Sequence, residues 1–227
     1  MVDLNALTRA NAGRWSNAKP TRKAEAAKVA SRLYQAKARY QSVEQVTGVP
    51  WPVIAVIHER ESSQSWGRSL AQGDPWNKVS VHVPAGRGPF SSWEEAAIDA
   101  LLNCHPYLAK RRDWSLAGVL IALEMYNGLG YASKGIPSPY LWAGTNQYRS
   151  GKYVRDGVYD PDHVDQQLGC VAMLRAMMVI DPTIAFPGTK VPPSQAPQEA
   201  PSVACPSKGS IGAFVANIFN AIFKRKS

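Results

Sequence analysis

The chain has 227 residues, of which 45% are hydrophobic and 19% charged, which is enough for one buried core with additional segments. Its formal net charge of +9 favours anionic partners such as nucleic acid, anionic lipid or a polyanionic cell wall. The basic residues are scattered and show neither zinc-finger spacing nor alternation with aromatic residues, so we expect no nucleic-acid partner. No apolar run of the sequence is long enough to span a bilayer.

The cysteines, the histidines and the first residues bear on the compartment and on metals. The three cysteines are widely spaced, which argues against a disulfide framework and fits a reducing cytoplasm: Cys104, Cys170 and Cys205. Three histidines lack mutual ligand spacing: His82, His105 and His163. Residues 1–5 contain neither a basic nor an apolar region, so we expect no secretory signal. We also expect a monomer without metal or cofactor.

Residues 1–187 predict a mostly helical domain. Its N-terminal helices are expected over residues 3–47. The first, over residues 3–18, is a weak helix or an arm. The second is a long, basic, alanine-rich helix over residues 21–46, with apolar side chains at helical spacing and Thr21 as its N-cap.

The core of the domain is expected over residues 49–182. It begins with a helix over residues 53–63, and the glycines and prolines of residues 64–90 then favour a loop. Within that loop, residues 79–83 alternate like a short strand. We expect this segment to flank a cleft.

Three more helices are expected in the core. Ser91 or Ser92 caps one that runs to about Cys104, and Asp113 caps a strongly apolar one over residues 114–126. A long loop follows. The last core helix is expected to start at Asp160 and to end near Ile180.

Two further segments follow the domain. Residues 188–208 are rich in proline and predict an extended linker. Residues 209–227 place apolar side chains at helical spacing and end in Lys224-Arg225-Lys226, which predicts a basic amphipathic helix. This helix either packs on the domain or contacts an anionic membrane, and its basic end favours the membrane.

The most informative feature is the end of the helix over residues 53–63. Its apolar run ends abruptly in His58-Glu59-Arg60-Glu61-Ser62-Ser63. A carboxylate that leaves a buried helix at its C-terminal end is partly desolvated and faces the negative end of the helix dipole, and both effects favour the protonated form. Acid-catalysed cleavage of a glycosidic bond needs such a group. Glu61 is the better candidate because it lies in the last turn, and His58 shares its helical face.

Two other carboxylates are candidates for a second catalytic role. Asp74 lies in the glycine-rich loop, where it either assists water and the developing positive charge or simply forms a turn with Gly73 and Pro75. Glu124 lies on an otherwise apolar helix, so it either lines a cleft or has a buried partner. After it, Tyr126 offers a stacking face. Asn127 offers an amide for an N-acetyl sugar, or else a left-handed helix C-cap.

Several of these segments resemble known sequences. Residues 57–62 (IHERES) resemble the catalytic helix end of goose-type lysozymes and soluble lytic transglycosylases, where a Glu followed by Ser closes an apolar helix. Residues 126–131 (YNGLGY) resemble the Tyr-Asn-Ala-Gly element of those enzymes. Three more segments resemble a bacterial and phage lysozyme-family group that includes endolysins: residues 72–75 (QGDP), 83–89 (VPAGRGP) and 138–145 (SPYLWAGT).

The resemblance covers roughly residues 49–180 and implies a mostly α (α+β) lysozyme-like fold, a bundle-like helical domain with a small β element beside the substrate cleft. It implies cleavage of the β-1,4 bond between N-acetylmuramic acid and N-acetylglucosamine in peptidoglycan. Glu61 is then the catalytic acid, with Asp74 or Glu124 as its partner. The residues expected to hold sugars are His58, Tyr126, Asn127, Tyr140 and Trp142.

The chain also departs from the family pattern. Gly128-Leu129-Gly130 replaces the family's Ala-Gly, and the Gly-Leu-Met-Gln segment of the transglycosylases is absent. Hydrolysis is therefore expected, with a transglycosylase giving a 1,6-anhydro sugar as the alternative. Two functions without catalysis also fit the sequence: a wall-binding module and a carrier for a membrane-active tail. Without a signal, the cell wall is expected to be reached through a holin, cell lysis or virion delivery.

Overall fold

The computed structural model describes residues 2–71, 73–82 and 84–188, all of which belong to the first of two units, Met1–Lys190. Of these described residues 51% are helical, in nine α-helices and a short 3-10 helix, with one two-stranded antiparallel sheet. The prediction of a mostly α domain with a small β element is therefore confirmed. The linker and the tail helix, from residue 189 onward, lie outside the described residues. No helix among the described residues is both long and apolar enough to cross a membrane.

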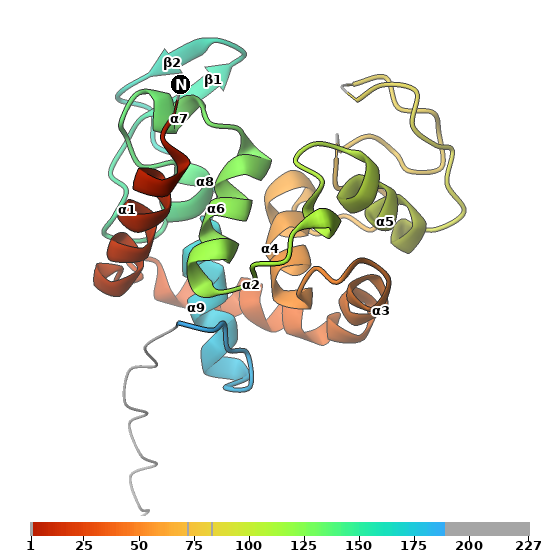
Figure 1. The fold of residues 1–227 in the computed structure, drawn as a ribbon, viewed down its shortest axis with the longest axis horizontal. Helices are drawn as coiled ribbons and strands as arrows, with labels where there is room; N and C mark the ends of the chain where they lie inside the picture. The colour runs from red at the N-terminus through yellow and green to blue at the C-terminus, as the bar shows by residue number, and fades with distance from the viewer. Residues whose placement is uncertain (1, 72, 83, 189–227) are drawn as a thin grey trace, which may run out of the picture. The chain divides into compact units, whose positions relative to one another are not determined.

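The first half of the domain contains four helices: α1 (Leu4–Asn17), α2 (Lys23–Gln35), α3 (Lys37–Thr47) and α4 (Trp51–Ser62) (Figure 1). Asp3 caps α1, because its carboxylate accepts hydrogen bonds from the backbone N–H groups of the first turn. The single helix predicted over residues 21–46 is wrong: it breaks at Ala36 into α2 and α3. Its predicted N-cap is also wrong, since Arg22 precedes α2 and makes no side-chain cap.

The second half adds shorter elements: α5 (Trp93–Asn103), a 3-10 helix (Leu108–Lys110), α6 (Leu116–Asn127), α7 (Gly130–Ser133), α8 (Pro139–Trp142), β1 (Lys152–Arg155), β2 (Val158–Asp160) and α9 (Cys170–Ile180). Ser92 caps α5 as predicted, because its hydroxyl accepts from the Glu95 N–H at 3.1 Å. Ser115, and not Asp113, caps α6. The last helix begins at Cys170, well after the predicted start at Asp160.

The small sheet lies elsewhere than predicted. Residues 79–82 form no strand; instead the backbone N–H groups of Val81 and His82 donate to the Asp74 carboxylate at 2.9 and 3.0 Å. The two strands are β1 and β2, joined through Asp156 and Gly157 in a hairpin whose register pairs Lys152 with Asp160. Gly157 has φ +70°, a conformation that tight hairpin turns require.

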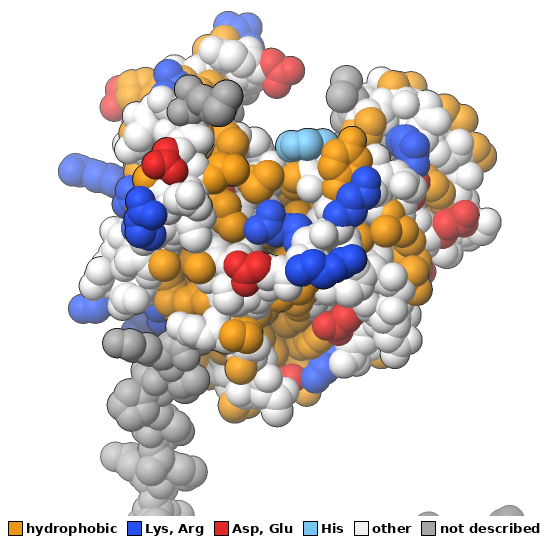
Figure 2. All heavy atoms as spheres, in the orientation of Figure 1, with side chains coloured by type: hydrophobic (Ala, Val, Ile, Leu, Met, Phe, Trp, Pro, Cys, Tyr) orange, Lys and Arg blue, Asp and Glu red, His pale blue; other side chains and the backbone are white. Residues whose placement is uncertain are grey.

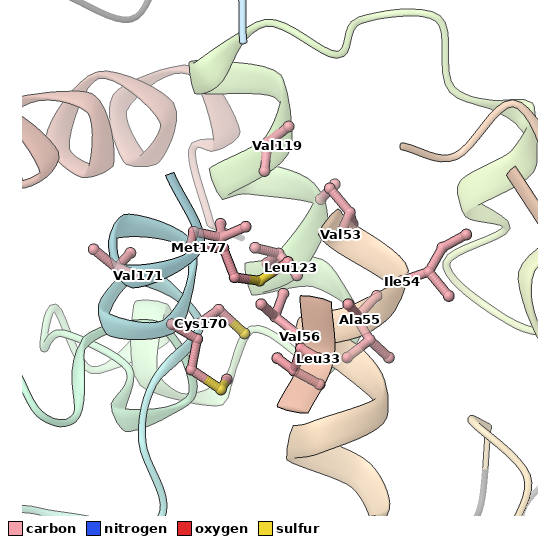
Figure 3. Close-up of a cluster of buried hydrophobic side chains, with 14 of the residues drawn as sticks. Leu33, Val53, Ile54, Ala55, Val56, Val119, Leu123, Cys170, Val171 and Met177 are labelled. Atoms are coloured by element: carbon pink, nitrogen blue, oxygen red, sulfur yellow. The ribbon is translucent and has the colours of Figure 1, made fainter. Parts of the chain in front are cut away.

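The core forms where α2, α6 and α9 meet around α4. Figure 3 shows side chains of α2 (Leu33), α4 (Val56), α6 (Leu123) and α9 (Met177) gathered in one cluster, and all four are fully buried. Every residue of α4 from Trp51 to His58 is buried, as expected for a helix covered on all sides. Each large apolar side chain buried here contributes about 1.5–3 kcal/mol. This packing fixes the direction of α4, and with it the position of the polar residues at its C-terminal end.

Candidate active site

Glu61 lies in the last turn of α4, directly after the buried part of the helix. Glu61 is a half-buried residue, and its Oε1 accepts a hydrogen bond of 2.8 Å from the Tyr140 hydroxyl. Burial raises the pKa of Glu61 to about 7, while the Tyr140 hydrogen bond and the Arg60 charge act in the opposite direction. A carboxyl group with this pKa holds a proton at near-neutral pH and can release it to a substrate.

The chain turns sharply after Glu61. Ser63 and Gln64 adopt left-handed conformations, with φ 53° and 59°. The Gln64 side chain accepts from Arg32 Nε at 2.7 Å and donates to the Tyr40 hydroxyl at 3.1 Å, which anchors the turn to the N-terminal helices. The loop that follows returns to the end of α4, because a Cβ on Gly73 would lie 3.5 Å from the Glu61 backbone oxygen.

Tyr140 positions Glu61. It belongs to α8, which begins with Pro139 after the capping residue Ser138, and its side chain is buried. The Arg60 guanidinium lies 4.8 Å from the centre of the Tyr140 ring, at a distance that allows a cation–π interaction. A ring that is buried in this way has little surface to offer a sugar. The structure therefore gives Tyr140 a positioning role toward Glu61 in place of the expected sugar contact.

A buried ion-pair cluster supports this arrangement. The Asp165 side chain, only 1% exposed, accepts from Arg60 Nη2 at 3.0 Å and from Lys152 Nζ at 2.8 Å. It connects the end of α4 with β1 through one carboxylate. Arg60 is 105 residues from Asp165 in sequence, and no sequence pattern indicated this pairing. The one local signal is that Arg60, a charged residue, follows directly after the buried part of α4.

A cavity of about 350 Å³ opens beside these groups. Its lining comes from the end of α4, the end of α6, α8 and the β1–β2 hairpin, and includes Arg60, Asn127, Tyr131, Tyr140, Lys152 and Tyr153. Figure 2 shows a hollow on the drawn face between the hairpin and the segment of residues 64–90. Glu61 does not itself line this cavity, but its hydrogen-bond partner Tyr140 does.

Tyr126 and Asn127 are brought to the same region. The Tyr126 hydroxyl donates to the Leu70 backbone oxygen at 3.0 Å and so connects α6 with the loop of residues 64–90. The charge of Glu61 contributes to raising the pKa of Tyr126, after burial. Asn127 is exposed, and its amide donates to the Ser138 hydroxyl at 3.3 Å. Of the residues expected to hold sugars, Asn127 is the one with an exposed side chain in the cavity lining.

Asp74 makes a structural contact. Besides the two N–H donors of residues 81 and 82, its carboxylate lies 2.6 Å from His82 Nδ1. The hydrogen bonds from His82 lower the pKa of Asp74. Asp74 therefore fixes the loop, and it is not among the groups that shift the Glu61 pKa.

Glu124 lies on the side of α6 that faces α1. It is 2% exposed, and its Oε2 accepts a 3.5 Å hydrogen bond from the Asn11 amide. Burial raises its pKa to about 7. Glu124 lines a different cavity from the one beside Tyr140. The structure thus does not bring either candidate for the second carboxylate into contact with Glu61.

His58 and Trp142 lie in the interior. Both are fully buried. The two ring nitrogens of His58 are 3.1 Å from the Tyr40 hydroxyl and 3.0 Å from the Ser65 backbone oxygen, and burial lowers the His58 pKa to about 4. The structure therefore does not support the expected sugar contacts for these two residues. Glu59, the other carboxylate at the end of α4, forms an ion pair of 2.7 Å with Arg32.

Among the described residues, no group of three or more His, Cys, Asp or Glu side chains could hold a metal ion. Comparison of the chain with protein-family models, with curated proteins and with solved structures gives no match. A functional proposal therefore depends on the chemistry of the site itself.

Proposed function

We propose that this chain is a peptidoglycan-cleaving glycosidase with a lysozyme-like fold, which cuts the β-1,4 bond between N-acetylmuramic acid and N-acetylglucosamine with Glu61 as general acid. The observation that carries the proposal is the state of Glu61: it is a half-buried residue at the end of a buried helix, and the pKa of its carboxyl group is raised to about 7. Cleavage of a glycosidic bond requires a carboxylic acid that keeps its proton near neutral pH. The motif resemblance around residues 57–62 supports the same role.

The hydrogen bonding of Glu61 suits proton donation. Tyr140 occupies Oε1, and Oε2 has no hydrogen-bond partner among the residues that the structure describes. Oε2 then carries the proton and donates it to the oxygen that leaves. As the bond from the sugar C1 to that oxygen breaks, positive charge develops on the sugar ring and Glu61 becomes a carboxylate. Tyr140 stabilises that carboxylate through the hydrogen bond it already makes.

The lack of a nearby second carboxylate among the described residues favours a second reaction. Asp74 is bound to its own loop and Glu124 faces α1. A single carboxylate can still complete a reaction in which it takes the proton from the C6 hydroxyl of the muramic acid while O6 bonds to C1. That path regenerates the acid and yields a 1,6-anhydro sugar without consuming water. The transglycosylase reaction is therefore the second candidate.

The replacement Glu61→Gln tests the role of Glu61. We expect it to abolish release of soluble fragments from purified peptidoglycan, because the amide is nearly isosteric and carries no transferable proton. Glu59→Gln is the matched control, since Glu59 lies two residues away on the same helix and pairs with Arg32. Unchanged lysis by Glu61→Gln would refute the proposal, whereas loss of lysis in both variants would point to damage of the helix end.

Mass spectrometry of the released fragments separates the two reactions. Hydrolysis gives reducing ends, and transglycosylation gives products lighter by one water. A non-catalytic wall-binding module would retain the chain on peptidoglycan and release neither product, so the same assay also tests for such a module.

The partner and the site of action belong to the same proposal. The net charge of +9 suits an anionic cell wall, with action at the wall or periplasm after holin opening, lysis or virion delivery. Residues 209–227 are proposed to contact an anionic membrane surface. Deletion of those residues should reduce binding to anionic liposomes and leave activity on isolated wall unchanged; equal liposome binding by both forms would count against the membrane role.

A further inference from the structure

A second cavity, of about 510 Å³, lies between α1, the end of α6 and residues 132–138. This volume is within the range of about 300–1,000 Å³ that is typical of small-molecule sites. The α1 side chains that line it follow helical spacing and therefore share one face of the helix: Ala6, Leu7, Ala10, Asn11 and Arg14. Because two of them are alanines, the face leaves space between the helices. Figure 1 shows α1 beside α6 and α7.

The most unusual group in this cavity is Glu124. It is 2% exposed, and the Asn11 amide, 3.5 Å from Oε2, is its one hydrogen-bond donor among the described residues; Oε1 accepts none of the described hydrogen bonds. A buried carboxylate normally has a strong partner, because an unpaired charge in the interior is costly. Glu124 thus lines the cavity as a buried residue whose Oε1 accepts none of the described hydrogen bonds.

The lining of this cavity also includes a cation. Arg14 lines it and makes no ion pair or hydrogen bond among the described residues. Arg14 and Glu124 both line this cavity, and the Arg14 charge lowers the pKa of Glu124. The third charged residue of the lining, Asp3, is occupied in capping α1. The remaining walls include apolar residues: Leu7, Ile136 and Pro137.

We propose that this cavity binds the head group of an α-amino acid, with the ammonium on Glu124 and Asn11 and the carboxylate on Arg14. A carboxyl group and a guanidinium in one cavity are complementary to a zwitterion, because the ligand ammonium favours the carboxylate form of Glu124 and each charge of the ligand then meets its opposite. The apolar walls suit an aliphatic side chain. The inference is independent of any reaction at Glu61, although Ser138 lines this cavity and also accepts the bond from Asn127 in the other cavity.

The test is an NMR titration of the full chain with norleucine as the probe. Two matched compounds each lack one charge: pentylamine has no carboxylate and hexanoic acid has no ammonium. We expect norleucine to shift resonances of α1 and α6 and both matched compounds to bind at least about tenfold more weakly, because a charged hydrogen bond is worth about that factor or more. Equal binding of norleucine and hexanoic acid, or no binding of norleucine, would overturn the inference.

Variants of the chain provide the second arm. Glu124→Gln and Arg14→Gln should each weaken norleucine binding at least about tenfold. Arg9→Gln is the matched control, because Arg9 is an exposed residue of the same helix that does not line the cavity. Circular dichroism establishes that each variant is folded. Folded Glu124→Gln and Arg14→Gln variants with unchanged affinity would contradict the inference.

The head group can come from two sources, a free amino acid or the free end of a diamino acid in a peptide of the cell wall. A disaccharide-peptide with such a free end, titrated against Glu61→Gln, distinguishes them. Binding that is weakened by the further replacement Arg14→Gln identifies the peptide as a ligand of this cavity. Binding of norleucine alone to the cavity identifies the free amino acid.

Discussion

The Tyr140 hydroxyl donates a hydrogen bond of 2.8 Å to Oε1 of Glu61 and so connects α8 with the last turn of α4. This bond stabilises the carboxylate form of Glu61 and opposes the effect of burial. The balance of burial against this bond and the Arg60 charge leaves the pKa of Glu61 at about 7. Tyr140 therefore controls both where the carboxyl lies and the pH range in which it holds its proton.

Removal of the Tyr140 hydroxyl should change the pH dependence of activity. In Tyr140→Phe the carboxylate loses its donor, so the pKa of Glu61 rises above about 7. Because the general acid must be protonated, the alkaline limb of the kcat/KM profile moves to higher pH. We expect a lower rate at the optimum as well, since the carboxyl is less well positioned. A limb that stays in place or moves to lower pH would contradict this role.

Glu61 should make the protein less stable as the pH rises. Its pKa is about 7 in the folded chain against an ordinary value of 4.5, so the folded state binds more protons in this window. The free energy of unfolding therefore falls between about pH 4.5 and 7, by about 3 kcal/mol. Glu61→Gln removes this effect and should be more stable than the wild type at pH 8 but not at pH 4. Urea unfolding of the wild type and of Glu61→Gln at the two pH values measures this difference. Equal free energies of unfolding for the two proteins at pH 8 would show that Glu61 is not desolvated.

His58 should matter for stability and not for substrate binding. Its pKa is lowered to about 4, so the unfolded chain takes up a proton between about pH 6.5 and 4 and stability falls as the pH is lowered through that window. His58→Ala also leaves a cavity beside Tyr40 and should reduce stability by about 2–5 kcal/mol. The KM of the folded variant should be unchanged. A raised KM with unchanged stability would indicate a sugar contact after all.

The two cationic partners of Asp165 should contribute unequally. Asp165→Asn leaves Arg60 buried without its counter-charge, which should destabilise the fold by about 3–5 kcal/mol. Lys152→Met removes the more exposed partner and should cost less than about 1 kcal/mol. Thermal unfolding of both variants checks the difference. A similar loss of stability in the two variants would mean that the ion pair with Lys152, and not the one with Arg60, provides most of the stabilisation by Asp165.

The end of α4 was predictable because the signal was local. An apolar run followed by charged residues and serines gave the helix, its burial and the desolvated position of Glu61 from the sequence alone. The contacts of that position were not predictable in the same way. Tyr140 and Asp165 reach the helix end from segments 79 and 105 residues away, and only the packing of α8 and of the loop before α9 brings them there.

The position of the sheet shows how a local pattern can be overridden. Residues 79–83 alternate like a strand, but the Asp74 carboxylate takes the N–H groups that a neighbouring strand would need. The actual hairpin has Asp156-Gly157 at its turn, flanked by residues with high strand propensity. In contrast, no glycine or proline marks the break at Ala36, so the sequence does not predict it. The cavity at Glu124 is equally hard to predict, because the small residues of α1 that leave room for it are ordinary helix formers.

Two residues with left-handed backbone conformations follow the end of α4, and one of them is a position where a substitution should increase the stability of the fold. Ser63 and Gln64 have φ 53° and 59°, and a residue with a Cβ in this conformation costs roughly 1 kcal/mol relative to glycine. The Gln64 side chain is bonded to Arg32 and Tyr40, so its conformation is held by its contacts. Ser63 is exposed and its hydroxyl accepts or donates none of the described hydrogen bonds. A glycine at position 63 should therefore lower the conformational cost of this turn without altering the contacts of the nearby Glu61 carboxyl group.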